Sequence, residues 1–168
     1  MPLTSTVDLS VAALYTKILD LQSASAPVQA KFTVSLAEGT GANQANRVFA
    51  DRRTLAASAT ENLDLAGVLL DAFGDTIALA RVKVLIVRAS AANTNNVIVG
   101  GAGSNGFVGP FGAAAHTASV RPGGMVAFAC ADATGWPVTA GTADLLQIAN
   151  SGAGTSVEYE VIIIGATA

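Results

Sequence analysis

The sequence predicts an all-β protein: an antiparallel β-sandwich, jelly-roll-like, with about 8 to 10 short strands and at most one short helix. Three observations predict this fold. Apolar and polar residues alternate with a period of two, the alternation recurs at intervals of about ten residues, and glycine-rich turns separate the alternating stretches. A period of two places side chains of one kind on one face of a strand, which suits a half-buried sheet.

The composition indicates one domain with an unusually uncharged surface. The chain has 168 residues, of which 51% are hydrophobic and only 12% are charged. We therefore interpret residues 1–168 as a single β-sandwich domain, with residues 1–27 able to form an extended N-terminal arm. A surface with so few charges suggests burial against copies of the chain or another partner. The alternative is a monomer covered by Ser, Thr and Asn.

The first two alternating stretches lie near the N-terminus. Residues 7–22, VDLSVAALYTKILDLQ, carry apolar residues at both strand and helix spacing, and we favour a strand. In residues 31–36, KFTVSL, the side chains of Phe32, Val34 and Leu36 share one face, opposite Lys, Thr and Ser. This second stretch predicts a half-buried strand.

The middle of the chain contains one possible helix and several strands. Residues 64–75, DLAGVLLDAFGD, could form one or two helical turns before Gly74. Residues 81–88, RVKVLIVR, predict a long strand because they are rich in β-branched residues. The stretches NNVIVGG, HTASV and GMVAFACA continue the series, separated by the turn sequences GAGSNG and RPGG.

The C-terminal part predicts a hairpin. The sequence ANSGAGTS at residues 149–156 separates DLLQI from the final apolar stretch, VEYEVIII. In that stretch Glu158 and Glu160 occupy one face, and apolar residues then occupy both faces. We expect a strand that begins half-exposed and ends buried.

Charge and residue counts argue against several kinds of partner and cofactor. The net charge is −3 and no block of basic residues occurs, so we expect no nucleic-acid partner. One Cys and one His cannot form a disulfide or a zinc cluster, and no calcium-loop motif appears, so we expect no metal site. The N-terminus does not resemble a signal peptide, and no apolar run has membrane-spanning length, so we expect neither secretion nor a membrane partner.

A glycine motif at residues 97–112, VIVGGAGSNGFVGPFG, could indicate a nucleotide site. Gly101, Gly103 and Gly106 match G-x-G-x-x-G, which in dinucleotide-binding proteins precedes a helix whose N-terminus holds the phosphates. Here Gly109 and the residues that follow it would break such a helix. We therefore interpret the glycines as serving backbone geometry, and we predict no cofactor-binding residue.

A weaker motif could indicate a serine nucleophile. Ser104 lies in AGSNG, near the pattern G-x-S-x-G, and His116 is the one available base. The first glycine of the pattern is replaced by Ala102 and no helix follows. We predict no catalytic residue, and we expect the protein not to be an enzyme.

Three aromatic residues are candidates for contact with a partner. Phe107 and Phe111 lie in a charge-free segment, and Trp136 precedes Pro137 in a turn. We predict that Phe107, Phe111 and Trp136 contact the partner. An exposed aromatic could also bind sugar, so a glycan-binding β-sandwich module with Trp136 in its site is an alternative.

Much of the chain, from about Arg53 onward, resembles small structural proteins of tailed bacteriophages. The resemblance is carried by RTLAASATENLDLAG, AANTNNVIVGGAGSNGFVGPFG, VRPGGMVAFACADATGWPVTAGTADLLQIANSGAGTS and VEYEVIIIGA. Proteins of this size and jelly-roll appearance are often capsid decoration, or cement, proteins. The resemblance implies a homotrimer that is assembled in the host cytoplasm and binds the major capsid protein on the exterior of the virion. The alternative within this class is a tail, baseplate or head-spike component.

Overall fold

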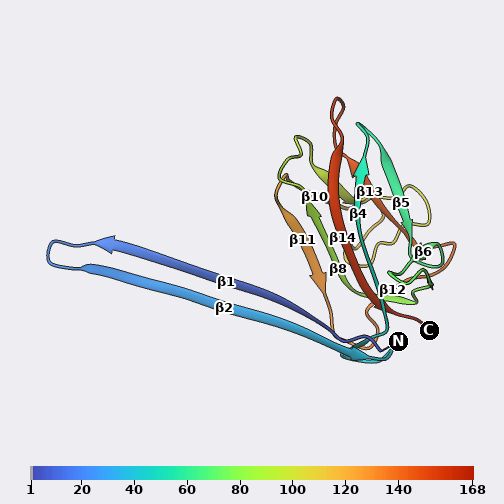
Figure 1. Ribbon diagram of the computed structural model, residues 1–168, viewed down its shortest axis with the longest axis horizontal. Coiled ribbons are helices and arrows are strands. Elements are labelled where there is room, and N and C mark those ends of the chain that lie inside the picture. Colours follow the sequence, from blue (N-terminus) through green and yellow to red (C-terminus); the bar gives the residue numbers. More distant parts are fainter. Residues whose placement is uncertain (1) are drawn as a thin grey trace.

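Two antiparallel sheets pack face to face, and a long hairpin projects away from them (Figure 1). The computed structural model describes residues 2–168. All of the secondary structure within this range is β-structure, without a helix. The predicted all-β antiparallel sandwich is therefore confirmed.

A five-stranded sheet forms one layer of the sandwich. Its strand order is β11-β8-β14-β4, and β12 also pairs with β8. The strands are β4 (Arg47–Leu55), β8 (Arg81–Ala89), β11 (Met125–Ala129), β12 (Trp136–Pro137) and β14 (Val157–Ala166).

A four-stranded sheet forms the other layer, in the order β10-β9-β13-β5. Its strands are β5 (Thr60–Asp64), β9 (Val97–Gly100), β10 (Thr117–Val120) and β13 (Leu145–Asn150). Three short strands lie outside the two layers: β3 (Gln44–Ala45), β6 (Leu69–Leu70) and β7 (Thr76–Ile77).

The two layers contain eight main strands, which are all of their strands except the two-residue β12. Their pairing is nested: the first pairs with the last, the second with the second last, and so on inward. The first of them, β4, pairs with the last, β14, and the second, β5, pairs with β13. Inside these pairs β8 pairs with β11, and β9 with β10. The chain thus doubles back on itself as one long ribbon, which folds over to make both sheets.

The main core lies between the two sheets. Its most deeply buried side chains come from alternate positions of the central strands of both layers, as the period of two requires. They include Leu85, Leu146, Ile148, Tyr159 and Ile163.

The possible helix at residues 64–75 does not form. The short strands β6 and β7 pair with each other instead, which buries Leu69 and Ile77 in the main core. The Asp71 side chain accepts hydrogen bonds from the backbone N–H groups of Phe73 and Asp75 at 2.8 and 3.0 Å. Because this side chain closes a tight turn, and Gly74 adopts a φ of 88°, the segment is a hairpin.

The projecting element is a hairpin of β1 (Ser5–Ile18) and β2 (Ser23–Glu38), which we call the arm. Its pairing runs without interruption from Ser5 opposite Leu36 to Ile18 opposite Ser23. The stretch at residues 7–22 is a strand up to Ile18, and the KFTVSL stretch belongs to the arm rather than to the sandwich. The projecting segment therefore extends to Glu38, beyond the residues 1–27 expected from the sequence.

A second, smaller core fixes the base of the arm to the sandwich. Leu36 of the arm and Ala45 of β3 pack against Val84 and Ile164, which lie on the outer face of the five-stranded sheet. Val7 and Val34 of the arm pack at the edge of this cluster. The arm is therefore rooted on the outside of the sandwich, while the rest of its length extends away.

Candidate interaction surfaces

The arm has one apolar face and one polar face. Residues that pair directly in an antiparallel hairpin point to the same side. The register therefore assigns five successive pairs to one face: Val7 with Val34, Leu9 with Phe32, Val11 with Ala30, Ala13 with Val28, and Tyr15 with Ala26. We call these ten residues the apolar arm face.

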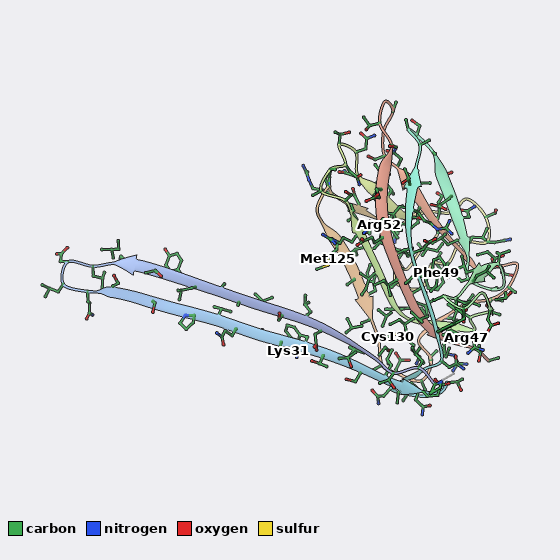
Figure 2. All side chains as sticks on the ribbon, in the orientation of Figure 1. Lys31, Arg47, Phe49, Arg52, Met125 and Cys130 are labelled. Carbon is green, nitrogen blue, oxygen red and sulfur yellow. The ribbon has the colours of Figure 1, made fainter. Side chains whose placement is uncertain are left out.

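The apolar arm face is covered only at its base. Val7 and Val34 pack against the sandwich, but Phe32 is 63% exposed and Tyr15 is 77% exposed. Figure 2 shows the side chains of the arm, with Lys31 labelled, standing clear of the sandwich. A folded monomer rarely leaves such a contiguous apolar strip in water, so this surface is suited to contact with another molecule.

The tip of the arm is apolar on its other face as well. Leu14 and Ile18 lie on the side opposite Tyr15, and Ile18 is 85% exposed. Leu21, in the turn between the strands, is 99% exposed. A segment with apolar residues on both faces is suited to burial on both faces.

The polar face of the arm, nearer its base, carries charged and hydroxyl side chains. Lys31 forms an ion pair with Asp8 at 3.1 Å, and the Thr33 hydroxyl donates a hydrogen bond to Asp8 at 2.6 Å. The hydrogen bond from Thr33 and the neighbouring ammonium of Lys31 lower the pKa of Asp8. These side chains keep one side of the arm hydrated, which leaves the apolar arm face as the side available for packing.

The outer face of the five-stranded sheet carries a second uncovered apolar strip. Strand register aligns Ala50, Ile162, Ile86 and Ala127 across β4, β14, β8 and β11, and we call these four residues the apolar row. Ile162 is 37% exposed, Ala50 and Ala127 are exposed, and Ile86 is half-buried. The apolar row lies next to the residues that the base of the arm already covers.

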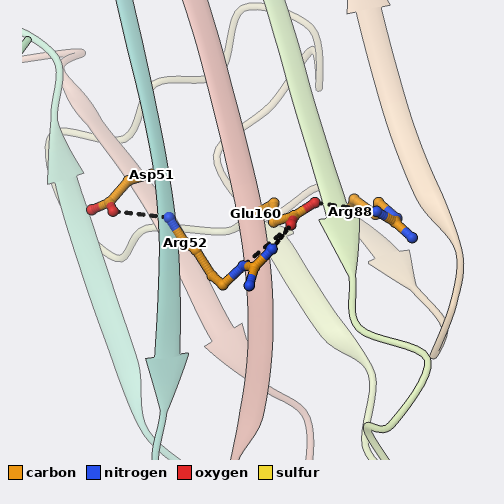
Figure 3. Close-up of polar contacts among 4 residues, drawn as sticks. All are labelled: Asp51, Arg52, Arg88 and Glu160. Carbon is orange, nitrogen blue, oxygen red and sulfur yellow. Dashed lines mark hydrogen bonds and ion pairs between the residues drawn. The ribbon is translucent and has the colours of Figure 1, made fainter. Parts of the chain in front are cut away.

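A charged row borders the apolar row on its other side (Figure 3). Glu160 pairs with Arg52 at 2.6 Å and with Arg88 at 3.3 Å. The hydrogen bond from Arg52, together with the charges of both guanidinium groups, lowers the pKa of Glu160. These residues line a hollow of about 390 Å³ at the end of the sheet. Because the lining holds two guanidinium groups and two carboxylates, those of Glu158 and Glu160, the hollow offers no net charge to a ligand.

Phe107, one of the three predicted contact residues, is not available to a partner. It is 3% exposed and belongs to the main core. Its backbone N–H donates to the Leu145 carbonyl at 2.9 Å, which holds the segment against β13. The prediction of a surface role for Phe107 is therefore wrong.

Phe111 and Trp136 are partly buried and pack against the core. Both rings meet Phe128 edge-on, with centroid distances of 5.6 Å for Phe111 and 6.3 Å for Trp136. This aromatic cluster is far along the chain from the arm. The three predicted contact residues thus lie in the main core or pack against it, and they do not form one exposed patch.

The glycine motif has a structural role that can be read from two of its members. Gly101 has a φ of 81°, a conformation that side chains with a Cβ rarely adopt. A Cβ at Gly106 would lie 3.2 Å from the carbonyl oxygen of Ala102. The motif therefore forms a tight loop at the end of β9.

Ser104 and His116 are not joined by a hydrogen bond. The Nδ1 atom of His116 lies 2.9 Å from the carbonyl oxygen of Phe111, and both Ser104 and His116 are exposed. No group of three or more His, Cys, Asp or Glu residues able to hold a metal ion occurs within residues 2–168. Across the same residues, no helix is long and apolar enough to span a membrane.

Comparisons with protein-family models, curated proteins and solved structures found no match to this chain. The candidate surfaces are therefore defined by the chain's own geometry. Sequence reasoning did not identify the arm face or the apolar row as contact surfaces. The signals were present in the alternation of residues 7–15 and 28–34 and in the low charge. Residues 1–27 were expected to be able to form an arm, but residues 31–36 were interpreted as a half-buried strand.

Proposed function

We propose that this chain is a non-enzymatic structural protein of a bacteriophage virion: a capsid decoration, or cement, protein that binds the major capsid protein and stabilises the shell. The observation that carries the proposal is the arm, an apolar hairpin that projects from a rigid sandwich. Such an element is suited to joining protein subunits.

The topology supports a jelly-roll classification. Jelly rolls contain eight strands in two sheets, built as two Greek keys. The nested pairing of β4 with β14, β5 with β13, β8 with β11, and β9 with β10 is the pattern expected when one long antiparallel ribbon folds over in this way. The jelly-roll fold and the sequence resemblance to phage structural proteins favour the same class.

The surface chemistry supports a structural role over ligand binding. The hollow beside Glu160 is lined by two guanidinium groups and two carboxylates whose charges balance, and Trp136 packs against Phe128. A glycan site needs an aromatic face open to the sugar, and the contacts of Trp136 use part of its ring. By contrast, the exposed apolar side chains are concentrated on the arm, where protein–protein contact is the chemistry available to them.

The test is binding to phage shells that lack this protein. We expect the purified chain to bind such shells, to reach hundreds of copies per particle, and to raise the temperature at which the shells open. Failure to bind any shell would contradict the proposal. A few copies per particle at one vertex or on the tail would instead identify a tail, baseplate or head-spike component.

A further inference from the structure

We propose that the apolar arm face packs on the apolar row of a second copy of this chain, so that neighbouring copies hold one another through their arms. The inference rests on the proposed function only in treating the chain as a structural subunit. It names the partner of the arm and the surface that receives it.

The arm requires a cover to keep its shape. A two-stranded hairpin is marginally stable at best when it stands alone in water. With 14 residues in β1 and a rise of about 3.3 Å per residue, the arm is roughly 45 Å long, and its outer pairs have no third strand beside them. Packing of one face on another protein would supply the missing contacts.

The structure already contains a contact of the required kind. At the base of the arm, Val34 and Leu36 on the apolar side of the ribbon pack on Val84 and Ile164 on the outer side of the five-stranded sheet. The apolar row is the next row on that same sheet face, and it has the same aliphatic character. Leu9 and Phe32 are the next pair on the arm, so both surfaces continue an existing interface.

A chain cannot make this contact with its own arm. Beyond its base, the arm points away from the sandwich that carries it (Figure 1). Ile162, Ala50 and Ala127 of the apolar row therefore stay exposed in the isolated chain, while Ile86 packs at the edge of the second core. The pair of Leu9 and Phe32 is exposed as well. Every copy therefore has an exposed arm face and an exposed row. Because the arm of one copy can cover the row of another, we favour a second copy as the partner.

The arm face offers a large apolar area to a partner. An aromatic side chain can bury 150–250 Å², so the exposed parts of Phe32 and Tyr15 alone offer roughly 200–350 Å². Leu9, Val11 and Val28 are each about half-exposed and add to this area. These five side chains supply a large part, though not all, of the roughly 800 Å² per partner of a typical specific interface.

Charge supports the same pairing. The five pairs of the apolar arm face contain no charged residue, and in the charged row beside the apolar row Glu160 forms ion pairs with both Arg52 and Arg88. Docking of the arm would therefore bury apolar side chains without leaving an unpaired charge in the centre. The ion pairs would lie at the rim, where interfaces are ordinarily polar.

The geometry of the contact allows a closed assembly. The arm and the apolar row are different surfaces, so two copies can exchange arms across a two-fold axis, or the arms can be passed in one direction around a ring of three or more copies. A closed ring of either kind, of which the exchanged dimer is the smallest, would satisfy every arm and every row.

The first test compares two neighbouring residues on opposite faces of the arm. We expect Val28→Asp to lower the mass of the purified full-length chain, measured by light scattering, from an oligomer to a monomer. Gln29→Asp, one residue along and on the polar face, should leave the oligomer unchanged. On the sheet, Ile162→Asp should also give a monomer, whereas Val68→Asp, at an exposed apolar position outside both surfaces, should not.

The second test detects the contact directly and does not depend on a disruptive substitution. In a Cys130→Ala background, a tagged chain with Phe32→Cys would be co-expressed with an untagged chain carrying Ile162→Cys. We expect a short bis-maleimide to join the two kinds of chain. A single chain carrying both cysteines should form crosslinked species that stop at the size of the closed ring.

Other outcomes would overturn the inference. A wild-type chain that is monomeric at micromolar concentrations, or crosslinking of Phe32→Cys chains to one another but not to Ile162→Cys chains, would contradict it. If the monomer still bound shells and its arm became protected from protease there, the arm would dock on the capsid protein, and the proposed function would survive. Crosslinked rings that never bind a shell would retain the inference and contradict the proposed function.

Discussion

The hydroxyl of Tyr159 donates a hydrogen bond of 2.6 Å to the carboxylate of Glu61, and this bond joins the two sheets. Tyr159 lies on β14 of the five-stranded sheet, and Glu61 lies on β5 of the four-stranded sheet. The second carboxylate oxygen of Glu61 accepts from Arg53 at 2.6 Å. Burial and the bond to Glu61 raise the pKa of Tyr159, so the phenol stays protonated and remains a donor.

Tyr159→Phe should therefore destabilise the sandwich without changing its fold. The variant keeps the buried ring but removes the partner of one Glu61 oxygen, and a hydrogen bond to a charged group contributes about 1.5–3 kcal/mol. The free energy of unfolding, measured with urea, should fall by that amount. Tyr15→Phe is the matched control because the Tyr15 ring is exposed on the arm. Equal stability of the two variants would show that the bond contributes nothing.

The ion pairs of Glu160 should make stability depend on pH. Because Arg52 and Arg88 lower the pKa of Glu160 below its usual value of 4.5, the folded state binds this proton less readily than the unfolded chain. The contribution is fully present above pH 4.5 and is lost as the pH falls through the lowered pKa.

Melting temperatures of the wild type and Glu160→Gln should therefore differ at pH 7, begin to approach each other below about pH 4.5, and converge only when the pH has fallen below the lowered pKa of Glu160. The difference should also shrink in high salt, since the pair is near the surface. Glu158→Gln is the control, because the Glu158 carboxylate forms no ion pair with the residues that the structure describes. A pH-independent difference would contradict the assignment.

Gly165→Ala should destabilise the protein through the backbone. Gly165 lies at an irregularity in the pairing of β14 with β8, and an added Cβ would overlap the carbonyl oxygen of Arg81. A carbonyl in a paired strand cannot move without disturbing the sheet, so we expect a loss of about 1–3 kcal/mol in urea unfolding. Gly103→Ala, in the glycine motif, should change stability by less than about 0.5 kcal/mol because nothing lies within 4 Å of its added Cβ. A large effect at Gly103 would contradict the open space around this residue.

Phe111→Ala should destabilise the fold. Its ring packs edge-on against Phe128 and is partly buried, so we expect a loss of about 2–3 kcal/mol, below the range for a fully buried Phe. Phe73→Ala is the matched control, since the Phe73 ring is largely exposed. Thermal unfolding by circular dichroism would compare the two. A Phe111 variant that keeps its melting temperature and loses only self-association would favour a contact role instead.

The local pattern of the chain was enough to predict the class of fold. Alternation in RVKVLIVR and VEYEVIII predicts strands, and the structure places them in β8 and β14 at the centre of one sheet. The glycines after the G-x-G-x-x-G motif argue against the helix that a nucleotide-binding loop needs. Gly101 does adopt the positive φ that a turn requires. These features depend on neighbours within a few residues, so they can be read directly from the sequence.

Only the tertiary structure decided which alternating strands lie in the core. Phe32 and Leu36 share one face of one strand, yet Leu36 is buried against Val84 while Phe32 is exposed on the arm. Alternation defines the two faces of a strand but does not specify what covers either face. Likewise, the bond between Tyr159 and Glu61 joins residues 98 positions apart, and Phe107 is buried because distant strands meet around it. The sequence by itself determined the local β-structure, and long-range packing determined which of its apolar surfaces remain open to a partner.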